Sequence, residues 1–168
     1  MLPQEIAPPQ TDESPVIIET HDLSRIYPGV VALDNVNYRV YRNKVNVLIG
    51  ENGAGKSTMM KMLAGVETPS SGKIILDGKE VTLNSTHQAE KHGISIIFQE
   101  LNLFPNMNVM DNIFMANEFF QKGKINEKYQ YELAKSLLER LELNVDPYTQ
   151  LGELGIGHQQ LVEIARAL

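Results

Sequence analysis

The stretch that most constrains this chain is GENGAGKST, residues 50–58. Gly50, Gly55, Lys56 and Ser57 fit the pattern of a Gly, four residues, a second Gly, a Lys and a Ser or Thr. The glycines let the backbone bend so that successive N–H groups point inward, where they can bind phosphate oxygens. The apolar run KVNVLIG leads into the loop and STMMKMLAG follows it, which predicts a buried strand before the loop and a helix after it.

The residue types of the loop suit a bound nucleotide. Lys56 supplies a mobile positive charge for the outer phosphates, and the hydroxyl of Ser57 suits a magnesium ligand. The helix that begins near Lys56 adds the positive end of its dipole. We therefore expect Lys56 to be catalytic and Ser57 to bind the metal. The predicted nucleotide-binding residues are Gly50, Glu51, Asn52, Gly53, Ala54, Gly55, Lys56, Ser57 and Thr58.

Composition excludes several other classes of function. The net charge of −6 argues against a surface for nucleic acid, which needs clustered Lys and Arg. The chain has no cysteine, which rules out disulfides and thiolate metal sites. Neither a secretory signal nor an apolar run long enough to span a bilayer is expected. Residues 1–15 hold four of the eight prolines and are predicted to be a disordered tail.

The apolar pattern predicts an order of elements along the chain. VIIET and VALDNVNYRV are expected to be strands of an antiparallel layer, and KIILDGKEVTL a hairpin about Asp77 and Gly78. GISIIFQ is expected to be a second buried strand, ending in Gln99. Beyond Asn108 the composition becomes helical, with one helix capped by Asn126 and a last amphipathic helix in GHQQLVEIARAL.

A phosphate loop alone leaves the reaction open. A GTPase is disfavoured, because neither an Asp-x-x-Gly after the loop nor an Asn-Lys-x-Asp is present. A small-molecule kinase stays an alternative, although its usual lid would carry arginines and the chain has none between Lys61 and Glu139.

Four segments, taken in order, resemble the ATPases of ABC transporters. They are LSRIYPGVVALDNVNYRV, LIGENGAGKSTMMKMLAGVETPSSGKIILDGKEV, HGISIIFQELNLFPNMNVMDNIFMANE and LGIGHQQLVEIARAL. They look most like the first ATPase module of sugar importers of the ribose, galactose and xylose class. The resemblance implies an α/β P-loop NTPase of the ABC-ATPase type, with a RecA-like core, an antiparallel β layer and a helical subdomain, incomplete at its C-terminus. It implies a domain over 16–168, with the nucleotide-binding core and β layer in 16–98 and the Q-loop, helical subdomain and signature helix in 99–168.

The same resemblance implies roles for further residues. Tyr27 matches the aromatic that stacks on adenine, and Gln99 the Q-loop residue that reaches magnesium and the attacking water. Residues 100–118 match the surface on which the transmembrane subunit docks. The signature loop matches Leu154, Gly155, Ile156, Gly157, His158 and Gln159. Gly155 stands where a Ser is expected, so the hydroxyl that would touch the terminal phosphate is missing.

The family also implies an Asp-Glu motif that these 168 residues do not reach. The expectation is therefore an ATP- and Mg²⁺-dependent energising subunit of a monosaccharide importer, at the cytoplasmic face of the bacterial inner membrane, of which this chain is a hydrolysis-incompetent fragment. The expected partners are transmembrane permease subunits, a second ATPase module and, indirectly, a periplasmic sugar-binding protein. A degenerate remnant that binds nucleotide without turnover is the main alternative.

Overall fold

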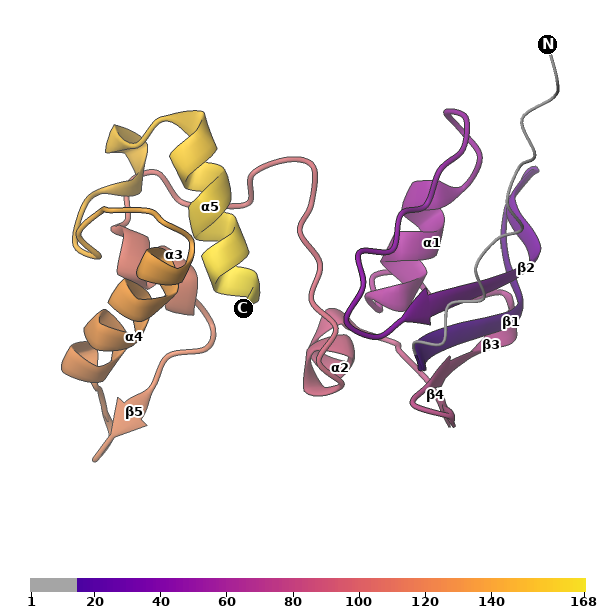
Figure 1. The fold of residues 1–168 in the computed structure, drawn as a ribbon, viewed down its shortest axis with the longest axis horizontal. Coiled ribbons are helices and arrows are strands. Elements are labelled where there is room, and N and C mark those ends of the chain that lie inside the picture. The colour runs from indigo at the N-terminus through magenta and orange to yellow at the C-terminus, as the bar shows by residue number, and fades with distance from the viewer. Residues whose placement is uncertain (1–14) are drawn as a thin grey trace, which may run out of the picture. The chain divides into compact units, whose positions relative to one another are not determined.

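The computed structural model describes residues 15–168, which form two compact units that divide between Ile94 and Ser95 (Figure 1). The predicted tail, residues 1–15, lies outside the described residues apart from Pro15. None of the helices in 15–168 is both long and apolar enough to cross a membrane.

The first unit is built on a four-stranded antiparallel sheet with the strand order β2-β1-β3-β4. The strands are β1 (Val16–Tyr27), β2 (Val30–Tyr41), β3 (Ser71–Leu76) and β4 (Lys79–Val81). The predicted antiparallel pairing of the first two strands is confirmed. Asp77 and Gly78, both with positive φ, make the predicted turn between β3 and β4, because a two-residue hairpin of this type needs the left-handed region at both positions.

The core of the first unit lies between the sheet and helix α1 (Lys56–Leu63). Met59 and Met62 on α1 are almost fully buried and share one apolar cluster with Leu23 and Leu33 of the strands. Gly65 follows α1 with a φ of 69°, a left-handed conformation that commonly ends a helix. Helix α2 (Thr86–Lys91) is capped by the side chain of Ser85 and completes the unit.

The buried strand predicted before the phosphate loop is not formed. Residues 45–50 pair with no strand in the described chain, and Val45 and Ile49 are 93% and 87% exposed. A strand buried on both faces needs neighbours in a sheet, to pair its backbone and to cover its side chains. The four strands of this sheet do not pair with residues 45–50, and apart from Leu48, which packs partly against the core, the apolar side chains of the segment are exposed. The prediction is therefore wrong for this structure.

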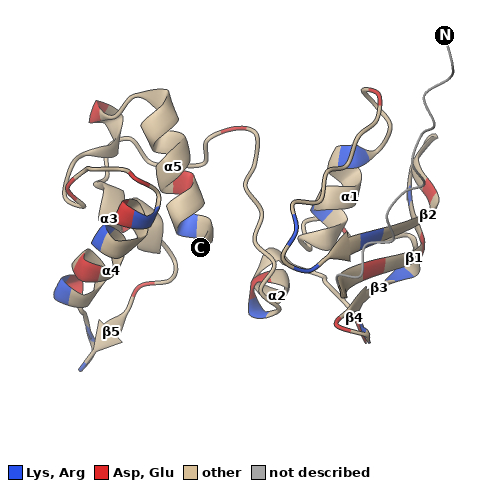
Figure 2. Cartoon of the chain, viewed as in Figure 1, with Lys and Arg blue, Asp and Glu red and all other residues tan. Residues whose placement is uncertain are grey.

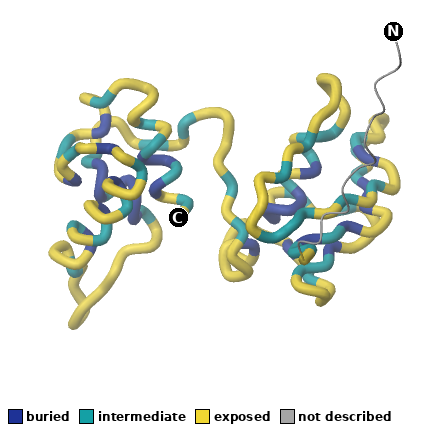
Figure 3. The backbone as a smooth tube through the Cα atoms, viewed as in Figure 1, coloured by how far each residue is buried: buried dark blue, intermediate teal, exposed yellow. Residues whose placement is uncertain are grey.

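The second unit is mainly helical, as predicted for the chain beyond Asn108, but it also contains a short hairpin that was not predicted. It contains α3 (Val109–Phe114), the short hairpin β5 (Phe120–Gln121) and β6 (Lys124–Ile125), α4 (Glu127–Arg140), a 3-10 helix (Leu151–Glu153) and α5 (Ile156–Ala167). Asn126 caps α4 by accepting a hydrogen bond from the backbone N–H of Tyr129, as predicted. Figure 3 shows the buried residues of this unit gathered where its helices meet. The buried cluster comprises Val109, Met110, Ile113, Phe114, Ala134, Leu138, Leu143, Leu151, Val162 and Ala165.

The second predicted buried strand, in GISIIFQ, is also wrong. Residues 94–98 have no strand partner among the described residues, and Ile97 is 48% exposed. The reason is the same as for residues 45–50, because an apolar run becomes a central strand only where neighbouring strands pair with it.

Candidate nucleotide-binding site

The backbone of the loop in residues 50–58 is shaped by two glycines with positive φ. Gly53 has a φ of 85° and Gly55 a φ of 82°, a region that residues with a side chain rarely adopt. Gly55 is also required for space, since a Cβ there would lie 2.5 Å from the carbonyl oxygen of Ala32 and 2.8 Å from Cδ2 of Leu33. The close approach of Gly55 to β2 therefore fixes the start of α1 against the sheet.

Lys56 folds its side chain back over the loop. Its ammonium nitrogen donates to the carbonyl oxygens of Gly50, at 2.7 Å, and Glu51, at 2.6 Å. A turn between Glu51 and Ala54 closes the loop, through a 3.2 Å bond from the backbone N–H of Ala54 to the carbonyl oxygen of Glu51. The ammonium group of Lys56 is thus held at the backbone carbonyl oxygens of the loop.

The first turn of α1 leaves its N–H groups without a side-chain cap. These donors are the ones that a helix cannot satisfy internally, and they carry the positive end of the helix dipole. Ser57 is exposed and Thr58 half-buried in this turn. Free N–H donors, a mobile ammonium group and an exposed hydroxyl form a set that fits a polyphosphate with one bound Mg²⁺.

Tyr27, at the end of β1, belongs to a network of side chains. Its hydroxyl is hydrogen-bonded to Glu67, and the guanidinium carbon of Arg25 lies 4.7 Å from the centre of its ring. Arg25 also forms an ion pair of 3.3 Å with Glu67 and donates to the carbonyl oxygen of Thr68 at 2.7 Å. One face of the Tyr27 ring is therefore covered by Arg25.

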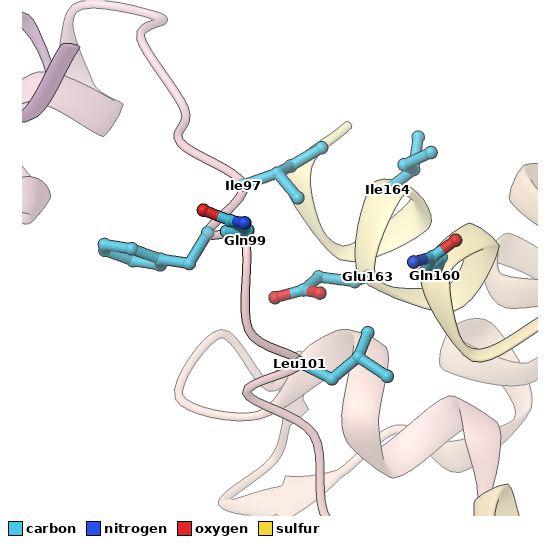
Figure 4. Close-up of a pocket in the computed structure, with 7 residues that line it drawn as sticks. Ile97, Gln99, Leu101, Gln160, Glu163 and Ile164 are labelled. Atoms are coloured by element: carbon cyan, nitrogen blue, oxygen red, sulfur yellow. The ribbon is translucent and has the colours of Figure 1, made fainter. Parts of the chain in front are cut away.

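Gln99 lies in the second unit, on an extended segment that faces α5. It lines a pocket of about 300 Å³ together with Ile97, Phe98, Leu101, Gln160, Glu163 and Ile164. Figure 4 shows the carboxylate of Glu163 directed from α5 toward the segment that carries Gln99 and Leu101. The phosphate loop lies in the first unit, and Gln99 and residues 154–159 lie in the second.

The predicted signature loop forms the start of α5. Gly155 occupies the position before the helix, with φ −62° and ψ 154° and no side-chain cap. Gln159 donates from its side-chain amide to the carbonyl oxygen of Leu154 at 2.8 Å, which ties the first turn to the preceding loop. Gly155 and, in the first turn of α5, Gly157 and His158 are exposed. A Cβ at Gly155 would contact nothing within 4 Å, so the structure has room for a Ser side chain at this position.

The comparison that decides the family is a match of residues 33–168 to the model described as "ABC transporter". This chain belongs to the ABC transporter family. Family membership decides against the kinase alternative and confirms the resemblance read from the sequence. Among solved structures, a nucleotide-free ATP-binding cassette from an ABC transporter is 28% identical, with a TM-score of 0.74 over 91% of this chain and 64% of that one. A cassette in its ADP conformation is 27% identical, with a TM-score of 0.76 over 92% of this chain and 65% of that one.

Curated relatives of the ABC family are named for sugar import. The xylose import ATP-binding protein XylG of Thermoanaerobacter pseudethanolicus is 47% identical over 157 residues, 92% of this chain and 31% of that protein. The ribose import ATP-binding protein RbsA of Clostridium perfringens is 45% identical over 148 residues, 87% and 30% respectively. The L-arabinose transport ATP-binding protein AraG of Geobacillus stearothermophilus is 45% identical over 157 residues, which are 92% of this chain and 31% of that protein. The chain thus spans about a third of the length of such relatives.

Three polar residues that hold the segment after Gln99 were not singled out from the sequence. Asn112 of α3 is buried and holds Phe104 at both its backbone groups, accepting from the N–H at 2.7 Å and donating to the carbonyl oxygen at 3.0 Å. Glu163 and Arg166 of α5 contact Asn102. The signal for Glu163 was a carboxylate directly between two apolar residues, Val162 and Ile164, in the second half of an amphipathic helix.

Proposed function

We propose that this chain is the ATP-binding part of the energising subunit of an ABC importer for a monosaccharide. The observation that carries the proposal is the loop of residues 50–58, where the ammonium group of Lys56 lies over backbone carbonyls beside an uncapped helix terminus. The names of the relatives support the choice of a sugar as the transported molecule.

In this proposal Lys56 exchanges its two carbonyl acceptors for phosphate oxygens of ATP. A charged hydrogen bond to phosphate is stronger than one to a neutral carbonyl, so the exchange favours the bound state. The N–H groups of the first turn of α1 bind the same phosphates, and Tyr27 presents its free face to adenine. Ser57 and Gln99 would hold Mg²⁺, which neutralises charge on the phosphates.

The second unit provides the partner contacts in this proposal. The permease docks on residues 100–118 and senses the Q-loop, while residues 154–159 close over ATP held by a second ATPase module. A periplasmic sugar-binding protein acts through the permease. The subunit works at the cytoplasmic face of the inner membrane, and its domain comprises a nucleotide-binding part in 16–98 and a helical part in 99–168.

The test of the nucleotide site compares two lysine variants of the same unit. Lys56→Ala removes the proposed phosphate contact, whereas Lys91→Ala removes an exposed lysine at the end of α2. We expect Lys56→Ala to weaken Mg-ATP binding by about 10- to 100-fold in calorimetry, the range of a charged hydrogen bond. Equal affinities in the two variants would contradict the assignment. Loss of pentose or hexose uptake in cells that lack the full-length subunit tests the transport part.

A second candidate, a nucleotide-binding protein without turnover, is favoured by Gly155. The variant Gly155→Ser separates the two candidates, because the site has room for the side chain and φ and ψ that suit a helix cap. If the full-length protein hydrolyses ATP slowly and Gly155→Ser accelerates it, the missing hydroxyl limits turnover. If both proteins bind ATP and neither hydrolyses it, the second candidate holds.

A further inference from the structure

The backbone of Asn102 is held by helix α5 at both of its hydrogen-bonding groups. Its N–H donates to Oε1 of Glu163 at 3.4 Å, and its carbonyl oxygen accepts from Nη1 of Arg166 at 3.0 Å. Glu163 and Arg166 are three positions apart and therefore share one face of the helix. They are the charged residues of α5, apart from His158, and Figure 2 shows them as one acidic and one basic band. The helix thus presents an acceptor and a donor to the same residue.

The burial of Glu163 indicates that this residue is there to hold the backbone of Asn102. Glu163 is 8% exposed, and within the described chain its carboxylate accepts a hydrogen bond from the backbone N–H of Asn102. A buried carboxylate is costly, and an apolar residue of similar volume often stabilises a fold as well or better. A Glu at this position is therefore better explained by what it holds than by packing alone.

The segment before Asn102 is held much less. No backbone–backbone hydrogen bond joins residues 95–101 to any part of the chain that the structure describes. From Asn102 onward the backbone is fixed, by α5 at Asn102 and by Asn112 of α3 at Phe104. The part of the Gln99 segment that makes no backbone–backbone hydrogen bond therefore ends at Asn102, where α5 holds the backbone.

We infer that Glu163 and Arg166 are positioning residues that anchor the Q-loop to the signature helix. Gln99 lies just before the anchor, and α5 begins at Ile156, directly after Gly155. A displacement of Gln99 is then transmitted through Asn102 into α5 and to the loop proposed to contact the second module's ATP. This inference rests on the proposed function for the roles of Gln99 and residues 154–159, whereas the anchor itself rests on the two hydrogen bonds.

The experiment uses the full-length protein that carries this sequence. Arg166→Ala and Glu163→Ala break the anchor, Arg166→Lys and Glu163→Gln retain part of it, and Arg140→Ala and Glu139→Ala on the exposed end of α4 are matched controls. We expect hydrogen exchange at the amide of Asn102 to accelerate about tenfold in Glu163→Ala, because this variant removes the acceptor of that N–H. Arg166→Ala removes the hydrogen bond to the carbonyl oxygen of Asn102, so it should accelerate the exchange less. We expect kcat to fall by about ten- to a hundred-fold, because a small misplacement of Gln99 slows the reaction. The KM for ATP should change by less than about twofold, with the conservative variants intermediate and the controls unchanged.

Two outcomes would overturn the inference. A normal kcat in Arg166→Ala or in folded Glu163→Ala would show that the anchor is structural only, and unchanged exchange in folded Glu163→Ala would show that Glu163 does not hold the amide of Asn102. Arg166 is exposed, so its variant should fold even if Glu163→Ala does not, and the thermal midpoint of each variant checks this. If the wild-type protein shows no turnover sensitive to Lys56→Ala, the proposed function fails, while the exchange measurement still decides whether the anchor exists.

Discussion

The ammonium nitrogen of Lys56 lies 2.6 Å from the carbonyl oxygen of Glu51, five residues earlier in the same loop. Because both groups belong to an exposed loop, this hydrogen bond contributes little to the stability of the fold. The same cation contributes far more once it meets a phosphate, whose negative charge the neutral carbonyl lacks.

We therefore expect Lys56→Ala to separate stability from nucleotide binding. Without nucleotide, its free energy of unfolding should fall by no more than about 1 kcal/mol. With Mg-ATP, the rise in melting temperature that binding produces in the wild-type domain should disappear. Thermal melting with and without Mg-ATP checks both points, and a large loss of stability in the nucleotide-free variant would make Lys56 a structural residue instead.

The packing around Gly55 predicts a large effect of adding one methyl group. Gly29 and Gly55 have nearly the same φ, 80° and 82°, but a Cβ at Gly29 would meet nothing within 4 Å. Both Ala variants carry the conformational cost of a positive φ, about 1 kcal/mol. Gly55→Ala also overlaps the carbonyl oxygen of Ala32, so we expect it to lose about 1–3 kcal/mol more than Gly29→Ala in chemical denaturation. Equal losses would mean that α1 shifts easily away from β2.

Tyr27 can be tested for its two possible roles separately. Tyr27→Phe removes the hydroxyl bound to Glu67 and keeps the ring, whereas Tyr27→Ala removes both. If the ring stacks on adenine, Tyr27→Phe should bind ATP nearly normally and lose about 0.5–1.5 kcal/mol of stability. Tyr27→Ala should weaken ATP binding by a further factor of about ten. Similar losses of affinity in both variants would point to the network of Arg25 and Glu67 and not to stacking.

Sequence patterns predicted the elements whose signals are local. The turn at Asp77 and Gly78, the Asn126 cap and the helix of α5 each depend on neighbours in the sequence, and each is confirmed. The alternation of apolar residues in β1 and β2 likewise sufficed to predict an antiparallel pair.

The patterns failed where the structure depends on distant partners. Residues 45–50 and 94–98 are as apolar as central strands, but a pattern does not say whether neighbouring strands are there to pair with them. The contacts of Arg25 with Glu67 and of Arg166 with Asn102 join residues far apart in the chain, which a single sequence does not connect. The phosphate loop was predictable because its chemistry lies within nine residues.

Phe104 is the side chain with which to test the proposed docking surface. It is 50% exposed while its backbone is held by Asn112, so Phe104→Asp should change the surface without unfolding the second unit. Phe120, in the β5–β6 hairpin, is 67% exposed and serves as the matched control. In the full-length subunit we expect Phe104→Asp to lower sugar uptake by about tenfold or more and Phe120→Asp to lower it little, with ATP binding retained in both. Normal uptake in Phe104→Asp would count against docking at residues 100–118.

The 168-residue chain, purified alone, is expected to show no ATP hydrolysis above background. These 168 residues do not include the Asp-Glu motif that the family resemblance implies, whose Glu would be the general base, worth about 10²–10⁴ in rate. Within residues 15–168, no group of three or more His, Asp or Glu is placed to hold a metal ion. The effects of a missing general base and of missing carboxylate metal ligands need not add, because catalytic residues act as a unit, but each by itself slows turnover.

The assay requires a monodisperse sample, since Val45, Ile49 and other exposed apolar side chains favour aggregation. Hydrolysis that Lys56→Ala abolishes would come from this chain and not from a contaminant, and would show that a base lies within these residues.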